Sequence, residues 1–184
     1  MDDVPLAMIR DHMTHVPLYL CPAGYSIRPF VSGDERHWAE IETAAGEFPG
    51  QEQALEHFSQ FFGPSLDDVG DRCLILTDST GAAIGTAAAW YGQFKGEERG
   101  RVSWVGIVPD HQGKGLAKPL LSAVMARLAR DYGTAYLTTQ TTSWRAVNLY
   151  LAFGFVPYLG DGWSDEGWGL MEQVLQRRIL PLTN

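Results

Sequence analysis

A glycine-containing turn between an apolar segment and a helical pattern is the part of this sequence whose residue types best suit chemistry. Residues 105–119 read VGIVPDHQGKGLAKP, and apolar residues at helical spacing follow them. The N–H groups in the first turn of a helix lack intrahelical acceptors and form the positive end of the helix dipole, so they suit a phosphate or pyrophosphate. Gly113 and Gly115 allow the backbone to approach such an anion closely, and Lys114 and Lys118 add positive charge. We therefore predict an anion-binding turn.

Two familiar nucleotide-binding loops do not fit the spacing of this turn. A Walker loop requires a serine or threonine after its lysine, but Lys114 is followed by Gly115. A dinucleotide-binding fingerprint, G-x-G-x-x-G, would place its third glycine at Lys118 if it began at Gly113. The sequence therefore disfavours both a P-loop nucleotide hydrolase and a dinucleotide-binding domain.

The spacing that the turn does match is Q-x-x-G-x-A, formed by Gln112, Gly115 and Ala117. Together with the apolar-x-Pro segment at 107–109 and the strand–turn–helix context, this spacing resembles the acetyl-CoA motif of the GNAT superfamily of N-acetyltransferases. A second block supports the resemblance, because residues 146–155 read AVNLYLAFGF where that family has A-x-x-L-Y-x-x-x-G-F.

The resemblance covers about residues 25–160 and is sharpest over 101–158. It implies that acetyl-CoA is the co-substrate, without a metal, and that the pantetheine arm pairs with residues 106–108 like an added strand. The family often has asparagine three residues before the alanine of the second block, and this chain departs from that pattern with Ser143. The residues expected to contact acetyl-CoA are Gly106, Ile107, Val108, Gln112, Gly113, Lys114, Gly115, Leu116, Ala117, Lys118, Ser143 and Tyr150.

Acetyl transfer from a thioester to an amine needs a base, an oxyanion contact and a proton donor for the leaving thiolate. A base is needed because an alkylammonium, with a pKa of about 10.4, is protonated at pH 7. By resemblance, Tyr150 is the general acid, although its position also fits a core tyrosine on an amphipathic helix. The resemblance also implies that the backbone N–H of Ile107 or a neighbour faces the oxyanion. Gly106 inside a strand fits a β-bulge, or simply a tightly packed position.

The candidate bases are carboxylates near the expected site. We predict Glu97 and Glu98, which directly precede the strand expected at 101–108, as catalytic residues. Glu47, in the loop after the first expected helix, is an alternative, and His111 is another, although it lies in the glycine turn. Each carboxylate also fits a solvated surface charge.

The acceptor is less well specified by the sequence. A threonine-rich segment, 138–142, could line an acceptor tunnel, or it could reflect β-propensity and a helix cap. The first two helices of the family usually form one wall of the acceptor pocket. Here they carry aromatic and acidic residues, which suit a cationic amine with an apolar part, although core packing explains the aromatic residues equally well. These residues are Trp38, Glu42, Glu47, Phe48, Glu52, His57 and Phe61.

The elements that must position these residues follow from hydrophobic periodicity and turn signals. We predict an α/β fold whose mixed, largely antiparallel sheet has helices on both faces and a β-α-β unit at its parallel part. Residues 1–24 are expected to be an irregular tail, and 92–100 a polar loop. The expected strands are 25–30, 73–77, 82–91, 101–108, 135–139 and 155–159. The expected helices are 32–44, 51–62, 116–132, 143–153 and about 164–178.

Length and composition limit the remaining possibilities. The 184 residues fit one domain, 25–184, after the tail. With 14 Lys and Arg against 22 Asp and Glu, the net charge of −8 gives no basic surface for nucleic acid and weakly favours a cationic ligand. No signal peptide or membrane span is evident, and Cys21 and Cys73 are expected to be reduced in a cytoplasmic protein, away from the motif.

The sequence thus predicts an acetyl-CoA-dependent N-acetyltransferase acting by direct attack on a small amine acceptor. An acceptor on a protein, at its N-terminus or a lysine, remains an alternative, as does a CoA-binding regulatory domain without turnover. The sequence is also compatible with a homodimer.

Overall fold

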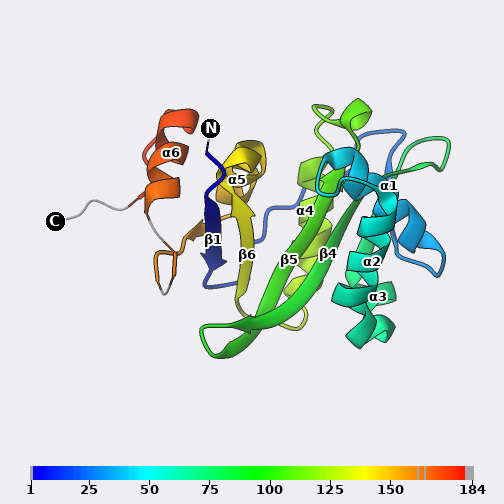
Figure 1. Cartoon of the computed structure of the whole chain (residues 1–184), viewed down its shortest axis with the longest axis horizontal. Coiled ribbons are helices and arrows are strands. Elements are labelled where there is room, and N and C mark those ends of the chain that lie inside the picture. The colour runs from blue at the N-terminus through cyan, green and yellow to red at the C-terminus, as the bar shows by residue number, and fades with distance from the viewer. Residues whose placement is uncertain (1, 161, 164, 181–184) are drawn as a thin grey trace.

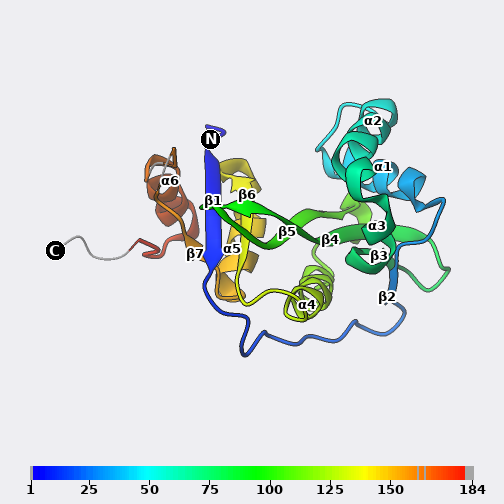
Figure 2. The ribbon, with the colours of Figure 1, turned by 90° about the horizontal axis from the view of Figure 1, so that it is seen from below.

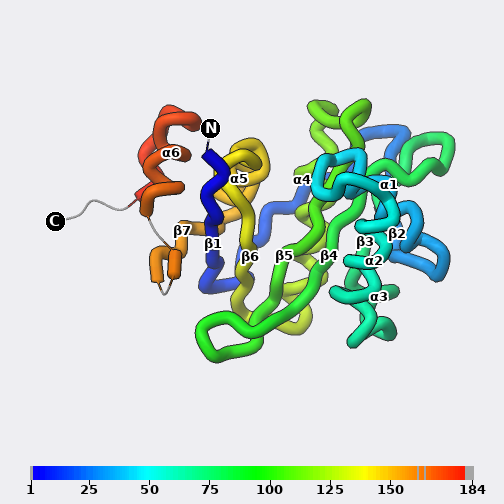
Figure 3. The backbone as a smooth tube through the Cα atoms, viewed as in Figure 1, coloured from blue at the N-terminus to red at the C-terminus, as the bar shows by residue number. Residues whose placement is uncertain are grey.

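One sheet organises the part of the chain that the computed structural model describes, residues 2–160, 162–163 and 165–180. Seven strands of these residues lie in the order β2-β3-β4-β5-β6-β1-β7 (Figures 1 and 3). All neighbouring strands are antiparallel except β5 and β6, which are parallel. The strands are β1 (Pro5–Arg10), β2 (Ser26–Pro29), β3 (Cys73–Thr77), β4 (Ala83–Phe94), β5 (Glu97–Ile107), β6 (Ala135–Gln140) and β7 (Val156–Pro157).

Helices cover both faces of the sheet, and β4 shows why. Successive side chains of a strand point to opposite faces, so Ala87 and Ala89 join one hydrophobic cluster while Ala88 and Trp90 join the other. The first cluster includes residues of α4, α5 and α6, and the second includes residues of α1, α2 and α3 (Figure 2). The predicted fold class is therefore confirmed. The helices are α1 (Asp34–Ala45), α2 (Gln51–Phe62), α3 (Leu66–Arg72), α4 (Ala117–Leu128), α5 (Trp144–Ala152) and α6 (Glu166–Leu175).

The two parallel strands at the centre of the sheet separate toward their C-terminal ends. β5 pairs with β6 only at Gly100 with Ala135 and at Arg101 with Tyr136. Beyond these pairs, β6 stays bonded to β1 on its other side, up to Gln140 opposite Pro5. Figure 1 shows the opening that results between β5 and β6. Polar groups on the facing edges of the two strands are thereby freed from the sheet ladder.

The prediction that residues 1–24 form an irregular tail is wrong for residues 5–10, which form the strand β1. This strand lies between β6 and β7, and the side chains of Leu6, Ala7 and Met8 are 0 or 1% exposed. Because both faces of β1 are buried, its residues lack the alternation of apolar and polar side chains that reveals a half-buried strand.

The chain between β1 and β2 passes along the outer side of α4 (Figure 2). Ser122 of α4 holds this segment at two points. Its Oγ donates to the carbonyl oxygen of Pro17 at 2.9 Å and accepts from the N–H of Tyr19 at 3.0 Å. The contact explains why a serine is buried on a helix whose neighbouring positions are apolar.

The polar segment 92–100, predicted as a loop, instead forms the tip of a long hairpin. β4 continues to Phe94 and β5 begins at Glu97, so that only Lys95 and Gly96 form the turn. Both turn residues have positive φ, as a tight hairpin turn requires. The polar composition of this segment reflects the exposure of the tip, and the sequence alone does not distinguish that from a loop.

Smaller differences concern the ends of elements. A helix that was not predicted, α3, follows α2, and the last strand is limited to Val156–Pro157. The expected final helix is confirmed as Glu166–Leu175, while its expected cap, Ser164, lies outside the described residues. Among the described helices, none has the length and apolar character needed to cross a membrane.

Candidate functional site

The glycine turn joins the end of β5 to the start of α4. Gly113 and Gly115 have φ of +75° and +79°, a backbone conformation that disfavours side chains, and no atom lies within 4 Å of where a Cβ would be at either residue. The side-chain amide of Gln112 donates to the carbonyl oxygen of Ile107 at 2.8 Å. The glutamine of the motif therefore fastens the turn to the end of the strand, and the two glycines leave its outer side open.

A cavity of about 580 Å³ extends from this turn to α5, and we call it the turn cavity. The turn fits a pyrophosphate, because the two open glycines precede the first N–H groups of α4 and Lys118 lies beside them. Of the residues expected to contact acetyl-CoA, Gly106, Val108 and Lys114 do not line the cavity. Those that do are Ile107, Gln112, Gly113, Gly115, Leu116, Ala117, Lys118, Ser143 and Tyr150.

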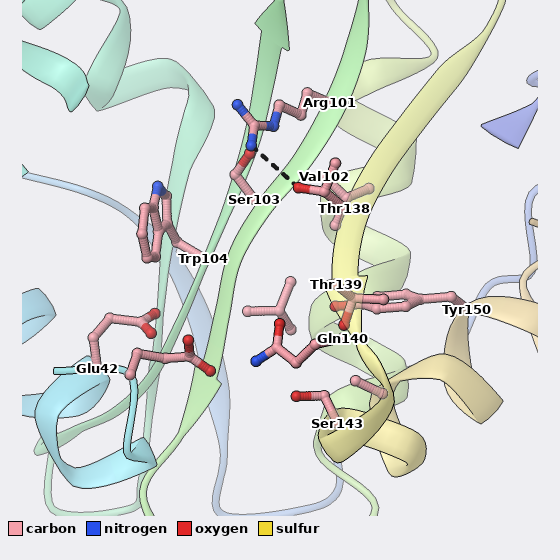
Figure 4. Close-up of a pocket in the computed structure, with 13 residues that line it drawn as sticks. Glu42, Arg101, Val102, Ser103, Trp104, Thr138, Thr139, Gln140, Ser143 and Tyr150 are labelled. Carbon is pink, nitrogen blue, oxygen red and sulfur yellow. Dashed lines mark hydrogen bonds between the residues drawn. The ribbon is translucent and has the colours of Figure 1, made fainter. Parts of the chain in front are cut away.

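A second cavity of about 220 Å³, which we call the strand cavity, lies where β5 and β6 separate (Figure 4). It shares Val105, Ser143, Ala146 and Tyr150 with the turn cavity, so the two hollows meet at α5. The lining of the strand cavity is mostly polar and comes from α1 and the residues after it, β5, β6 and α5. Its lining residues are Glu42, Glu47, Arg101, Val102, Ser103, Trp104, Val105, Thr138, Thr139, Gln140, Ser143, Ala146 and Tyr150.

A β-bulge in β5 shapes the wall between the cavities. Trp104 and Val105 lie opposite Ala87 alone, since Ser103 pairs with Ala88 and Gly106 with Thr86. Trp104 has a φ of +54°, which is unfavourable for a bulky side chain and concentrates strain at this point. The sequence suggested a bulge at Gly106, and the structure places it just before that residue.

Gly106 itself makes room for the carboxyl group of Glu42. A Cβ at residue 106 would lie 2.9 Å from Glu42 Oε1, closer than side-chain atoms normally approach. Glu42 is 1% exposed, and its Oε1 has no hydrogen-bond partner among the described residues. The glycine therefore serves the packing of a buried acid against the strand, in addition to any role toward a ligand.

The end of α1 brings a second carboxyl group beside the first. Gly46 has a φ of +94° and its N–H bonds to the carbonyl oxygen of Thr43, while the N–H of Glu47 bonds to the carbonyl oxygen of Glu42 at 3.0 Å. This is the Schellman arrangement, whose two flanking positions usually hold apolar side chains. Here they hold two glutamates, and both line the strand cavity.

Burial and nearby negative charges make both carboxyl groups easier to protonate than usual. Loss of hydration is the main cause that raises the pKa of Glu42 to about 8, and the charge of Glu47 adds to it. The pKa of Glu47 is also raised, first by burial and then by Asp3. A carboxyl group with a pKa near neutrality can accept and release a proton under ordinary conditions.

Tyr150 lies on α5 where the two cavities meet. Its ring packs edge-on against Phe155 with centroids 6.2 Å apart, and the side chain is nearly fully buried. Burial raises the pKa of its phenol, and the charges of Glu42 and Glu47 raise it further. The phenol is therefore protonated at neutral pH and open to both cavities.

The structure does not bring Glu97 and Glu98 to this site. Both lie near the tip of the β4–β5 hairpin, where Glu97 pairs with Arg99 and Glu98 accepts from the Tyr132 hydroxyl. Neither residue lines either cavity. The carboxyl groups that line the strand cavity belong to Glu47 and Glu42. Glu47 was predicted as an alternative base, and Glu42 was predicted on the wall of the acceptor pocket. The signal for Glu42 as a buried acid was its position four residues after Trp38 on the apolar face of α1.

The threonine-rich segment has two separate roles. Thr138 and Thr139 line the strand cavity, whereas Thr141 is fully buried and its hydroxyl accepts from the N–H of Val4 at 2.9 Å. The Thr142 hydroxyl donates a hydrogen bond to Asp3 Oδ1 at 2.8 Å, and Thr142 lines the turn cavity.

Within the described residues, no group of three or more His, Cys, Asp or Glu is arranged to hold a metal ion.

Comparison with known proteins agrees with this geometry. The sequence model of the acetyltransferase (GNAT) family matches residues 36–155. The chain is 30% identical to the mycothiol acetyltransferases of Pseudarthrobacter chlorophenolicus, over 152 residues, and of Streptomyces coelicolor, over 145 residues. Each match covers 76% of this chain and 45% of the relative, so the chain spans about half the length of the curated relatives it matches.

A solved structure gives the same result for the fold. A GCN5-related N-acetyltransferase from Sphaerobacter thermophilus superimposes with a TM-score of 0.66 at 22% identity. The match covers 85% of this chain and 49% of that one. The fold, the glycine turn and the family match lead to one conclusion: this chain belongs to the GNAT family of acetyltransferases.

Proposed function

We propose that this chain transfers the acetyl group of acetyl-CoA to a primary amine by direct attack. The observation that carries the proposal is the position of Tyr150 where the turn cavity meets the strand cavity, beside the Glu42 and Glu47 pair. One cavity suits a phosphorylated donor, the other suits an amine, and the groups that exchange protons lie between them.

Acetyl-CoA supplies an activated thioester when it is bound. Gly113, Gly115 and the first N–H groups of α4 hold its pyrophosphate, and Lys118 contributes charge. The backbone N–H of Ile107 or a neighbour faces the oxyanion of the tetrahedral intermediate. Ser143 lines both cavities, so it is placed to make the contact that asparagine often makes in the family.

The protons move between the amine, the glutamates and the tyrosine. Glu42 or Glu47, acting as one coupled pair, takes a proton from the amine as the new C–N bond forms. Tyr150 then gives its proton to the sulfur as the C–S bond breaks, so the products are an amide and free CoA. Neither Cys21 nor Cys73 lines the cavities, so the structure offers no cysteine there for a covalent intermediate.

The acceptor we propose is a small molecule. The strand cavity is small and set between two strands, which favours a compact amine over a protein lysine or N-terminus. The curated relatives are named for mycothiol, which points in the same direction. Their greater length leaves the acceptor of this chain open within that class.

The test is an acetylation screen over amines, with release of free thiol from acetyl-CoA as the readout. Calorimetry with CoA runs beside it. We expect CoA to bind and at least one small amine to be acetylated. Binding of CoA without turnover of any amine would support a regulatory domain in place of an enzyme. Absence of CoA binding would show that the glycine turn has another role.

A further inference from the structure

The strand cavity collects polar atoms that have no hydrogen-bond partner in the part of the chain that the structure describes. Eight buried side-chain nitrogen or oxygen atoms have no hydrogen-bond partner among the described residues. Four of them belong to residues that line this one cavity: Glu42 Oε1, Arg101 Nε, Ser103 Oγ and Trp104 Nε1. Buried polar atoms are nearly always paired in folded proteins, so such a concentration indicates groups that a ligand completes.

The charged groups of the lining are separated along β5. Arg101 offers only N–H donors at one end, whereas Glu42 beside Gly106 and its neighbour Glu47 offer carboxyl oxygens at the other. Arg101 and Gly106 are five residues apart on the strand, which corresponds to about 16 Å between their Cα atoms, somewhat less across the bulge. Figure 4 likewise shows Arg101 and Glu42 at opposite ends of the lining. The cavity therefore has a donor-rich end and an acidic end.

The side chain of Arg101 contacts aromatic rings and a hydroxyl group, but in the described part of the chain it has no carboxylate partner. Its guanidinium lies 5.6 Å from the ring centre of Phe61 and 5.7 Å from that of Tyr136, and it reaches the Thr138 hydroxyl at 3.4 Å. Within the described part of the chain, no carboxylate oxygen lies within 4.0 Å of it. Five other arginines do have such partners, namely Arg28, Arg72, Arg99, Arg127 and Arg130.

Arg101 lines the strand cavity without such a partner in the described part of the chain, although the net charge of the whole chain is −8. Planar guanidinium groups bind carboxylate and phosphate through paired hydrogen bonds, and stacking on aromatic rings fixes the plane in advance. A neutral hydroxylated ligand would satisfy Ser103 and Thr138 but would leave the charge of Arg101 without a partner. The donor-rich end therefore fits an anionic group better than a polyol.

We propose that the amine acceptor also carries an anionic group, a carboxylate or a phosphate, and that Arg101 binds it. The amino nitrogen then lies at the acidic end, beside Glu42 and Glu47. Because the two ends are well separated, the anion and the amine of the acceptor are several bonds apart. This inference depends on the proposed acetyl transfer and narrows its acceptor class from cationic amines to zwitterions.

The experiment compares matched acceptors on the wild-type chain and on variants of Arg101. The series contains ω-amino carboxylates of increasing length, amino phosphates of similar length, plain alkylamines without the anion and an amino polyol. Both kcat/KM for acetylation and calorimetric binding in the presence of CoA are measured. Arg101→Gln removes the charge, and Arg101→Lys keeps it without the planar fork. Arg130→Gln, at an exposed position just after α4, is the control with the same chemical change.

We expect the wild-type chain to prefer an anion-bearing amine of one length over the matched alkylamine. Arg101→Gln should lower kcat/KM and binding affinity for that acceptor about 10- to 100-fold, the usual range for a lost charged hydrogen bond. The same variant should leave kcat/KM for the matched alkylamine unchanged. Arg101→Lys should recover part of the preference. The carboxylate and phosphate arms show which anion is bound.

Two outcomes would overturn the inference while leaving acetyl transfer intact. One is equal use of alkylamines or the amino polyol by the wild-type chain. The other is an equal loss by Arg101→Gln for acceptors with and without an anion. If no amine is acetylated, the proposed function fails, and the calorimetric arm still decides whether Arg101 binds an anionic amine.

Discussion

At the scale of single residues, one helix end determines much of the chemistry. The left-handed Gly46 turns the chain so that Glu47 lies beside Glu42, and Gly106 leaves space for the Glu42 carboxyl group. The two acids then raise the pKa of Tyr150, which burial alone already raises. In the proposed mechanism, acid and base thus depend on each other, because the same enclosed site disfavours the charged form of both.

Replacing Tyr150 with phenylalanine tests its proposed role as the proton donor. The ring should still pack against Phe155, so we expect CoA affinity to change little while kcat falls about 10²-fold, the usual contribution of a general acid. Steady-state kinetics and calorimetry separate the two effects. Tyr132→Phe removes a hydroxyl that bonds Glu98 away from both cavities and is the control. Equal kcat for the Tyr150 variant and the wild-type chain would limit Tyr150 to packing.

Replacing Glu42 with glutamine tests whether its carboxyl group is buried in the neutral form, through the pH dependence of the free energy of unfolding. The folded chain holds this proton up to a pH of about 8, whereas the unfolded chain releases it near 4.5, so the folded state binds more protons in between. Stability of the wild-type chain should therefore fall as pH rises through this window, at up to about 1.4 kcal/mol per unit. Glu42→Gln should lack this fall and should also lower kcat.

Urea unfolding at pH 5 and at pH 8 measures the difference. Glu42→Gln should gain stability relative to the wild-type chain on going to the higher pH, while the exposed Glu52→Gln on α2 should follow the wild-type chain. Identical pH dependence in all three proteins would mean that Glu42 is not buried in its neutral form.

At the scale of elements, the sequence predicts the parts that carry strong local signals. The turn and α4 follow from glycine spacing and helical periodicity, and α2 is found with its predicted ends, Gln51 and Phe62. Glu97 and Glu98 were expected at the site because they are near β5 in sequence, whereas a tight turn carries them to the far end of the hairpin. The acids that line the cavity come from α1 and the residues just after it, which are distant in sequence from β5.

Replacing Gly115 with valine tests the glycine turn as an element. The site has room for a side chain, but its φ of +79° is costly for valine and the new atoms would project from the turn. We expect CoA binding to be lost at calorimetric concentrations, with a loss of stability of about 1–2 kcal/mol. Gly81→Val, at φ +86° and with equally open space in the β3–β4 turn, has the same backbone cost and should bind CoA normally. Normal binding by the Gly115 variant would exclude the proposed pyrophosphate contact.

At the scale of the whole molecule, the first strand, β1, joins β7 to the rest of the sheet, and the residues after β1 lead to β2 at the opposite edge. β1 pairs with β6 over six residue positions and with β7 over two, and Leu6 and Met8 belong to the same hydrophobic cluster as α4, α5 and α6. Residues 11–25 then return along α4 to β2 at the opposite edge of the sheet. The strand that borders the cavity, β6, is thus supported on one side by the first residues of the chain.

Removal of residues 1–10 tests this arrangement, because a tail would be dispensable, whereas a strand paired on both sides is not. The deletion exposes the edges of β6 and β7 and removes fully buried side chains, each worth about 2–5 kcal/mol against a usual total of 5–15 kcal/mol. We therefore expect loss of cooperative thermal unfolding and association through the exposed edges, seen by circular dichroism and size-exclusion chromatography. Leu6→Ala should destabilise the intact chain by about 2–5 kcal/mol, while Leu20→Ala, at an 83% exposed position, should not. A truncated chain that unfolds cooperatively at the wild-type temperature would mean that the sheet is complete without β1.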